Sequence, residues 1–173
     1  WDPASKAAAL FDTGTDASKA IATAVDLGLE LGQLFLTHTH LDHIIDRAAV
    51  EAHNEDLRTY VNALEPAERA TRFQPGDCFT VGALKISTRL TKGHSPGGIT
   101  YVIEGLERPV AIAGDALFAQ SMGGGMISYQ DALATNRSEL FTLADHTVIC
   151  PGHGPMTSVG EEKAHNPFYP EFK

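Results

Sequence analysis

Four potential metal ligands lie within six residues of this sequence, in the segment Thr37-His38-Thr39-His40-Leu41-Asp42-His43. Imidazole nitrogens and carboxylate oxygens suit Zn²⁺, Fe or Mn better than Ca²⁺ or Mg²⁺. An α-helix would bring His38 near Asp42 but would turn His40 to the opposite side. We therefore expect a loop after the apolar run Leu34-Phe35-Leu36, with the first two histidines facing one metal ion. Asp42 and His43 would face a second, and the alternative is a histidine-rich surface turn.

Three further potential ligands follow the ends of expected strands, each beside glycine: His94, Asp115 and His153. Glycine supplies the unusual backbone angles that a tight loop needs to aim one side chain. Together with the first segment they make seven ligands, which is the number that two metal ions need. We expect two metal ions that share the Asp115 carboxylate and a hydroxide as bridges. Metal A would take His38, His40 and His94. Metal B would take Asp42, His43 and His153.

Such a centre is suited to hydrolysis. Two divalent ions carry four positive charges against Asp42, Asp115 and a hydroxide, which leaves a positive site for an anionic tetrahedral intermediate. Metal coordination can lower the pKa of bound water from 15.7 to about 7, and paired ions sit about 3.5 to 4 Å apart. We therefore expect two divalent metal ions as cofactors, Zn²⁺ first and Fe or Mn as alternatives. Asp42 and Asp115 are the expected catalytic residues, and no protein nucleophile is required.

The expected strands and helices bring the ligands to strand ends. A strand over Ala7 to Asp12, a helix over Ala17 to Leu29 and a strand over Gln33 to Leu36 indicate an α/β layer with the first cluster at a strand's carboxyl end. A hairpin partner of the first strand is expected to be cut off upstream. A capping box at Ser128 predicts a helix to about Ala144. The remaining expected strands are 77–80 with 83–90, 99–104 with 108–113, and 147–150.

Two segments are assigned no chemistry. Ile44 to Ala70 is polar and helix-prone, is interrupted at Pro66, and is expected to serve as scaffold or lid. His53, within it, is expected to be a solvated or core histidine rather than a ligand. The tail from Gly160 to Lys173 is polar and is expected to fold over the surface.

Composition restricts the class of protein. With 173 residues, 43% of them apolar, the chain is expected to form a single domain over residues 1–173. The net charge of -9, without a run of basic residues, argues against nucleic acid. No apolar stretch approaches the roughly 18 residues that span a bilayer. Cys78 and Cys150 lie far apart, which fits a reducing cytoplasm. Because the sequence starts at Trp1, export stays an alternative. A small-molecule substrate is the expected partner, and the oligomeric state is left open.

The H-x-H-x-D-H signature, followed by separated His, Asp and His ligands, resembles that of the metallo-β-lactamase-fold hydrolases over nearly the whole chain. Gly114-Asp115-Ala116-Leu117-Phe118 and Pro151-Gly152-His153-Gly154 look most like the hydroxyacylglutathione hydrolase (glyoxalase II) branch. The resemblance implies an α/β fold, an αβ/βα four-layer sandwich with a dinuclear site at one edge, and hydrolysis of a small ester, thioester or lactone. It also implies that Asp12, in Asp12-Thr13-Gly14, orients a ligand loop. A plain turn role is the alternative.

The sequence departs from that branch in two ways. Its members usually carry a basic residue in the glycine-rich loop after the Asp ligand, whereas Ser121 to Gly125 contains none. The long helical glutathione-binding domain that follows the last His in full-length members is also not expected here. Metal chemistry is therefore better supported than the substrate.

The sequence has four alternative interpretations. Gly93-His94-Ser95-Pro96-Gly97 matches a serine nucleophile elbow, but Pro96 lacks the N–H that the oxyanion hole needs, and the histidines of the first cluster would have no role. A persulfide dioxygenase is a second alternative, because some relatives use the first-site histidines and the bridging Asp to hold one iron. A metallo-phosphodiesterase is disfavoured for polymers by the acidic charge. A metal module without enzymatic activity would need an inaccessible or single-metal site.

Overall fold

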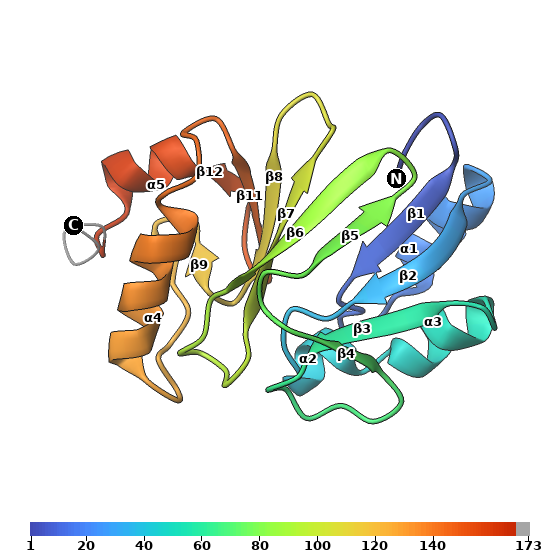
Figure 1. Ribbon diagram of the computed structural model, residues 1–173, viewed down its shortest axis with the longest axis horizontal. Helices are drawn as coiled ribbons and strands as arrows, with labels where there is room; N and C mark the ends of the chain where they lie inside the picture. The colour runs from blue at the N-terminus through green and yellow to red at the C-terminus, as the bar shows by residue number, and fades with distance from the viewer. Residues whose placement is uncertain (169–173) are drawn as a thin grey trace.

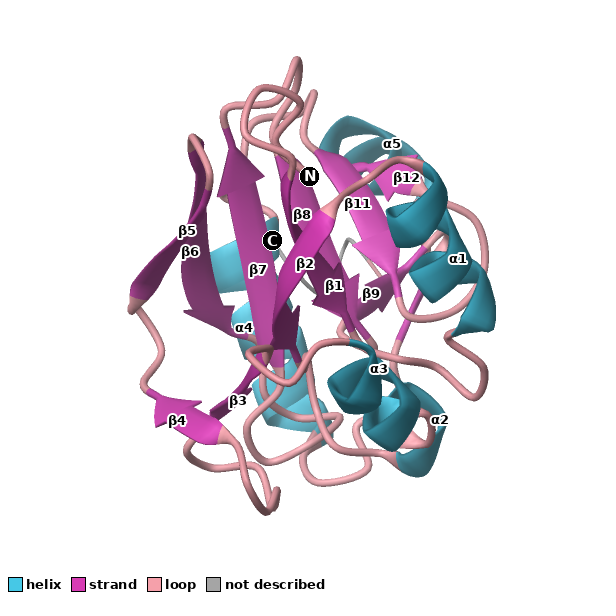
Figure 2. Ribbon diagram, turned by 90° about the vertical axis from the view of Figure 1, so that its right-hand side faces the viewer, coloured by secondary structure: helices cyan, strands magenta, loops and turns pink. Residues whose placement is uncertain are grey.

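The first of two facing β-sheets is built from parallel strands in the order β1-β2-β3-β4 (Figure 1). The computed structural model describes residues 1–168. The strands are β1 (Ala7–Phe11), β2 (Glu30–Phe35), β3 (Arg58–Asn62) and β4 (Thr71–Phe73). Three helices, α1 (Ser18–Asp26), α2 (Leu41–Ile44) and α3 (Arg47–His53), lie on the outer side of this sheet (Figures 1 and 2). Ala24 of α1 and Val50 of α3 join Leu34 and Val61 in one apolar cluster, which holds this helical layer against the strands.

The second sheet has the order β12-β11-β8-β7-β6-β5 and is antiparallel except where β8 pairs with β11. Its strands are β5 (Cys78–Val81), β6 (Leu84–Leu90), β7 (Ile99–Glu104), β8 (Val110–Gly114), β11 (Val148–Pro151) and β12 (Thr157–Ser158). A small hairpin, β9 (Leu117–Phe118) and β10 (Ser121–Met122), lies beside it. The outer layer consists of α4 (Tyr129–Thr135), a π-helix over Asn136–Leu140, and α5 (Val159–His165).

Aromatic side chains fill the space between the two sheets. Phe35 stacks on Phe11 and Tyr60, with ring centroids 5.3 and 5.1 Å apart. From the opposite sheet, the buried Tyr101 donates its hydroxyl to the carbonyl of Leu36 at 2.7 Å. Burial raises the pKa of Tyr101, so the hydroxyl keeps the proton that this bond needs. The sheet core therefore fixes the end of β2, where the ligand segment begins.

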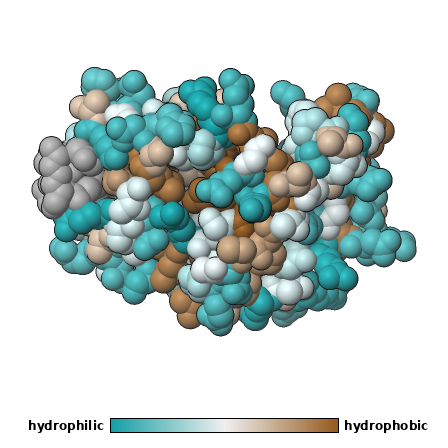
Figure 3. All heavy atoms as spheres, turned by 45° about the horizontal axis from the view of Figure 1, so that its top comes forward, coloured by the Kyte–Doolittle hydropathy of each residue, from teal (hydrophilic) through white to brown (hydrophobic). Residues whose placement is uncertain are grey.

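The four-layer α/β sandwich that the resemblance implies is confirmed. The two expected hairpins, the first α/β unit and the Ser128 cap, which accepts a hydrogen bond from Asp131 N, are present. The loops after β2, β6, β8 and β11 follow the carboxyl ends of these strands, which meet at one end of the sandwich. At the opposite end, apolar residues are exposed along the middle of the face and hydrophilic residues flank them (Figure 3).

Two expectations about the elements are wrong. The segment over 44–70 is not helical throughout, because the strand β3 follows the helix α3; the buried Thr59 of β3 is bonded to Glu51 within the segment and the buried Asn62 to Gly97 outside it. The helix that starts after Ser128 ends near Leu140 rather than Ala144, after its last turn widens into a π-helix. Residues 160–165 of the expected surface tail are helical, and 169–173 lie outside the described residues. Among residues 1–168, no helix has the length and apolar character to cross a lipid bilayer.

Candidate metal centre

The first ligand segment is a short loop that runs into one turn of helix. His38 and His40 lie in the loop after β2, and His40 is the extended residue that precedes α2. Asp42 and His43 lie within α2, so the expectation of a loop for all four residues is wrong for these two. The helical turn separates their environments, since His43 is buried at 4% exposure and the side chain of Asp42 is 50% exposed.

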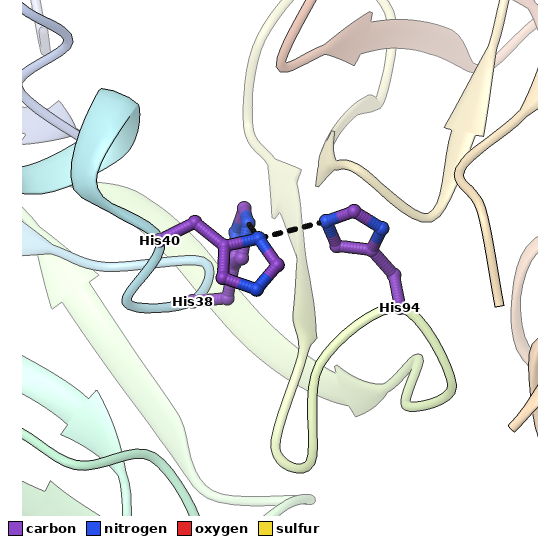
Figure 4. Close-up of side chains that lie close together, drawn as sticks. All are labelled: His38, His40 and His94. Atoms are coloured by element: carbon purple, nitrogen blue, oxygen red, sulfur yellow. Dashed lines mark hydrogen bonds between the residues drawn. The ribbon is translucent and has the colours of Figure 1, made fainter. Parts of the chain in front are cut away.

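The A set consists of His38, His40 and His94, whose rings point toward one another from two separate loops (Figure 4). His40 Nδ1 lies 3.0 Å from His38 Nε2 and 2.9 Å from His94 Nε2. Tetrahedral Zn²⁺ with Zn–N bonds of about 2.0 to 2.1 Å requires nitrogens roughly 3.3 Å apart. The three nitrogens are therefore close to the spacing that one ion needs.

The B set consists of Asp42, His43 and His153. Asp42 Oδ2 lies 3.1 Å from His153 Nε2 and 3.9 Å from His43 Nε2. This set is more open than the A set, because the side chains of His153 and Asp42 are 54% and 50% exposed. Its ligand atoms also lie within reach of one ion, but two of the three are supplied from the surface.

Asp115 lies between the two sets and is itself buried. Its Oδ1 is 3.3 Å from His43 Nε2, and its Oδ2 is 3.4 Å from His94 Nε2 and 3.5 Å from His153 Nε2. One carboxylate thus faces a member of the A set and two members of the B set. This is the position expected for a bridging ligand.

The buried polar atoms of the site fit a bound metal. Within the described part of the chain, the buried atoms His43 Nε2 and Asp115 Oδ1 face each other, 3.3 Å apart, and neither makes a hydrogen bond of good geometry. An unsatisfied buried group of this kind costs roughly 1 to 3 kcal/mol, and a cation would satisfy both atoms. Gly152 leaves the necessary room, since a Cβ there would overlap Asp115 Oδ1 and lie 2.7 Å from His43 Cε1. The nitrogen and oxygen donors suit Zn²⁺, Fe or Mn.

Asp12 holds the ligand segment from the end of β1. Its Oδ1 accepts a hydrogen bond from Thr37 N at 2.7 Å, and its Oδ2 accepts from Thr37 Oγ1 at 2.7 Å and lies 2.8 Å from His43 Nδ1. These contacts place the ring of His43 with Nε2 toward Asp115. They match the loop-orienting role that the resemblance implies for Asp12. On the A set, His94 Nδ1 lies 3.0 Å from the carbonyl of Gly124.

The pKa values of two histidines of the site, His38 and His43, are shifted in opposite directions. Burial lowers the pKa of His38 to about 3, helped by the charge on His43, so His38 is neutral and ready to bind a metal. Burial would also lower the pKa of His43, but hydrogen bonds and charge from Asp115 and Asp12 outweigh it and raise this pKa to about 10. Burial opposes ionisation of Asp115, yet the bond to His43 and the charges of the surrounding histidines hold its pKa below the usual range.

Sequence reasoning missed two buried polar residues that contact the ligand loops, Asn62 and Glu65. Asn62 Nδ2 donates to the carbonyl of Gly97, and Glu65 accepts from Gly97 N and from Thr39. Asn62 is the last residue of β3 and Glu65 lies in the turn after it, both in the segment for which no chemistry is expected. Recognition of β3 as a strand would have placed its end beside the other strand ends. His53, by contrast, is exposed, as expected.

A cavity of about 470 Å³ lies beside the B set. The ends of β1, β8 and β11 form its walls together with Asp42, His43 and His153. Residues from both sheets contribute to the lining, so the cavity connects the B set with the space between them.

Comparison with known proteins shows the family of this chain. The family described as the metallo-beta-lactamase superfamily matches residues 4–153. Hydroxyacylglutathione hydrolase GloC of Haemophilus influenzae is 30% identical, over 97% of this chain and 89% of the relative. The crystal structure of the BLEG-1 B3 metallo-beta-lactamase has a TM-score of 0.86 and 29% identity, and covers 98% of this chain and 91% of its own. The crystal structure of ETHE1 from Myxococcus xanthus has a TM-score of 0.86 and 27% identity, and covers 99% of this chain and 80% of its own. This chain belongs to the metallo-beta-lactamase superfamily.

Proposed function

We propose that this protein is a metal-dependent hydrolase of a small ester, thioester or lactone. The observation that carries the proposal is the position of Asp115, whose two carboxylate oxygens face both ligand sets. Two divalent ions, Zn²⁺ in the first place and Fe or Mn as alternatives, would supply an activated water and a polarised carbonyl. The similarity to a hydroxyacylglutathione hydrolase supports the hydrolytic class.

Asp42 and Asp115 are the catalytic carboxylates in this proposal, and their environments differ. Asp115 is buried among histidines, and its low pKa keeps it a negatively charged ligand. Asp42 lies beside His153 on the exposed side of the B set, where a carboxylate can accept a proton from water or substrate. Asp12 keeps His43 in position through its contact with Nδ1.

The surroundings of the centre favour an uncharged substrate. Four apolar side chains that lie close in sequence to a ligand or to a ligand loop are exposed. They are Leu41, Met126, Ile127 and Met156, with exposures of 72%, 71%, 62% and 71%. Two lysines that could have offered charge are engaged elsewhere, since Lys92 pairs with Asp131 at 3.2 Å and Lys163 with Asp145 at 2.6 Å. Together with the net charge of -9, this supports a neutral substrate over an anionic one.

S-D-lactoylglutathione should therefore be a poor substrate, since its two carboxylates and one ammonium need cations and anions at fixed positions. Loss of one or two charge-assisted contacts, at about 1.5 to 3 kcal/mol each, would lower kcat/KM roughly ten- to several-hundredfold. The test measures metal stoichiometry and then kcat/KM for thioesters, lactones, β-lactams and lactoylglutathione. The substrate proposal is wrong if lactoylglutathione is best in the panel, near ~10⁶ M⁻¹s⁻¹. The hydrolase proposal is wrong if protein with both sites loaded cleaves none.

A second candidate is a persulfide dioxygenase with one iron. The structural similarity to ETHE1 from Myxococcus xanthus favours it, because the human relative named persulfide dioxygenase ETHE1 is 28% identical over 96% of this chain. The compact A set, which is complete without the B set, favours it as well. Metal analysis of protein purified without added metal discriminates between the two. About one Fe per chain supports the dioxygenase, and two metal ions per chain support the hydrolase.

The cysteines bear on the location that we propose. Cys78 is exposed, Cys150 is partly buried, and both are free thiols. Burial raises the pKa of Cys150, which keeps it protonated and unreactive. Free thiols suit a reducing compartment, so we place the protein in the cytoplasm, with a small molecule as its substrate.

A further inference from the structure

Glu65 is a buried carboxylate that makes its contacts with the ligand loops rather than with the ligands. Its side chain is 2% exposed and lies in the turn after β3. Oε2 accepts hydrogen bonds from Thr39 Oγ1 at 2.7 Å and Thr39 N at 3.2 Å, and Oε1 accepts from Gly97 N at 2.7 Å. Hydroxyl and amide donors of this kind stabilise a charged acceptor strongly.

These contacts join the two loops that supply the A set. Thr39 lies between His38 and His40, and Gly97 lies three residues after His94. Figure 4 shows the rings of His38 and His40 from one loop pointing toward the ring of His94 from the other. A single carboxylate therefore spans the gap across which the three ligands must converge.

The loop that carries Glu65 is itself held firmly. Arg72 Nη1 donates to the carbonyls of Glu65 and Ala63 at 2.8 and 3.0 Å, and Nη2 donates to Ala67 O at 3.0 Å. Asn62, fully buried, donates to Gly97 O at 2.8 Å, so Gly97 is bonded through both its N–H and its carbonyl. The turn also packs tightly, since a Cβ at Gly97 would lie 2.8 Å from Leu64 Cβ and 3.1 Å from Glu65 Cγ.

We propose that Glu65 is a positioning residue that sets the distance between the His38/His40 loop and the His94 loop, and thereby the metal affinity of the A set. The inference rests on the proposed metal centre. Asp42 and His43 of the B set follow Thr39 in the helical turn α2, where His43 is held by Asp12 rather than by Glu65, so we expect the larger effect on the A set. Residues that orient metal ligands without binding the ion typically lower the metal affinity 10- to 100-fold when they are replaced.

The test compares Glu65→Gln with Glu162→Gln. Glu162 is a matched control, since it is 1% exposed and also accepts three hydrogen bonds, from Gln120 N, Thr157 Oγ1 and Asn166 Nδ2. In Glu65→Gln one acceptor oxygen becomes an NH₂ group, which cannot accept from Thr39 or Gly97. Metal-free proteins are titrated with Co²⁺ and Zn²⁺ against a chromophoric chelator, and thermal unfolding is measured in parallel.

We expect both variants to lose stability, but only Glu65→Gln to bind its A-set ion 10- to 100-fold more weakly, with a smaller effect on B-set affinity. Equal metal affinities in the two variants would overturn the proposal, as would equal weakening of both sites in Glu65→Gln. Thr39→Val, which removes only the hydroxyl donor, serves if Glu65→Gln does not fold, and should weaken the A set by a smaller factor. A wild-type protein that binds no metal would instead refute the metal centre.

Discussion

His43 should carry a proton at neutral pH in the metal-free protein, and this proton must leave when a metal ion binds the B set. Its pKa of about 10 exceeds the ordinary histidine value of about 6.5. The contribution of charged His43 to stability is therefore fully present below pH 6.5 and is lost as the pH rises through 10. Since one pKa unit corresponds to about 1.4 kcal/mol, the loss should reach a few kcal/mol.

The same proton competes with the metal. Between pH 7 and 9 the affinity of the B-set ion should rise about tenfold per pH unit, because His43 must be neutral to bind. The assay measures the second metal dissociation constant by competition at several pH values and follows the His43 ring nitrogens of the metal-free protein by NMR. Asp12→Asn should lower the His43 pKa and shift this dependence to lower pH. A pH-independent second constant, or a neutral His43 at pH 8 in metal-free protein, would refute the reasoning.

Three substitutions test the remaining roles. Asp115→Ala should remove most hydrolytic activity and lower the metal content, because the carboxylate that faces both sets is lost; normal turnover with full metal would contradict its assignment. Gly152→Ala should likewise reduce metal content, because its Cβ would overlap Asp115 and crowd His43, whereas Gly32→Ala, with nothing within 4 Å of the new atom, should leave metal binding unchanged. Ser95→Ala should retain activity within about tenfold; a complete loss with metals retained would revive a serine mechanism.

The sequence points to most of the proposed ligands because His38, His94, Asp115 and His153 each follow the end of a strand, whereas Asp42 and His43 lie in the helical turn α2. His94 and His153 lie far apart in the chain, yet both follow strands of the second sheet whose ends share one edge. Residue type and position along the expected strands were the signals for these candidates. The division into two sets also followed from spacing within 38–43, and the structure brings the same members together.

The supporting residues could not be predicted in the same way. Thr59 and Asn62 give β3 a polar pattern that does not suggest a buried strand, and their partners, Glu51 and Gly97, are 8 and 35 residues away. Hydrogen bonds over such separations satisfy buried polar groups without leaving a local signal. The role of Glu65 could not be predicted from the sequence for the same reason.

The difference between the two ligand sets also bears on the choice between hydrolase and dioxygenase. The A set contains the neutral, buried His38, and the Glu65 turn braces both of its loops. The B set includes two half-exposed ligands and the protonated His43, so an ion there competes with both water and a proton. The A set should consequently fill first. A protein with only this site filled has the single-ion arrangement considered for the dioxygenase, whereas hydrolysis by paired ions requires the B set as well. Under the proposed function, occupancy of the weaker site should therefore discriminate between the hydrolase and the dioxygenase.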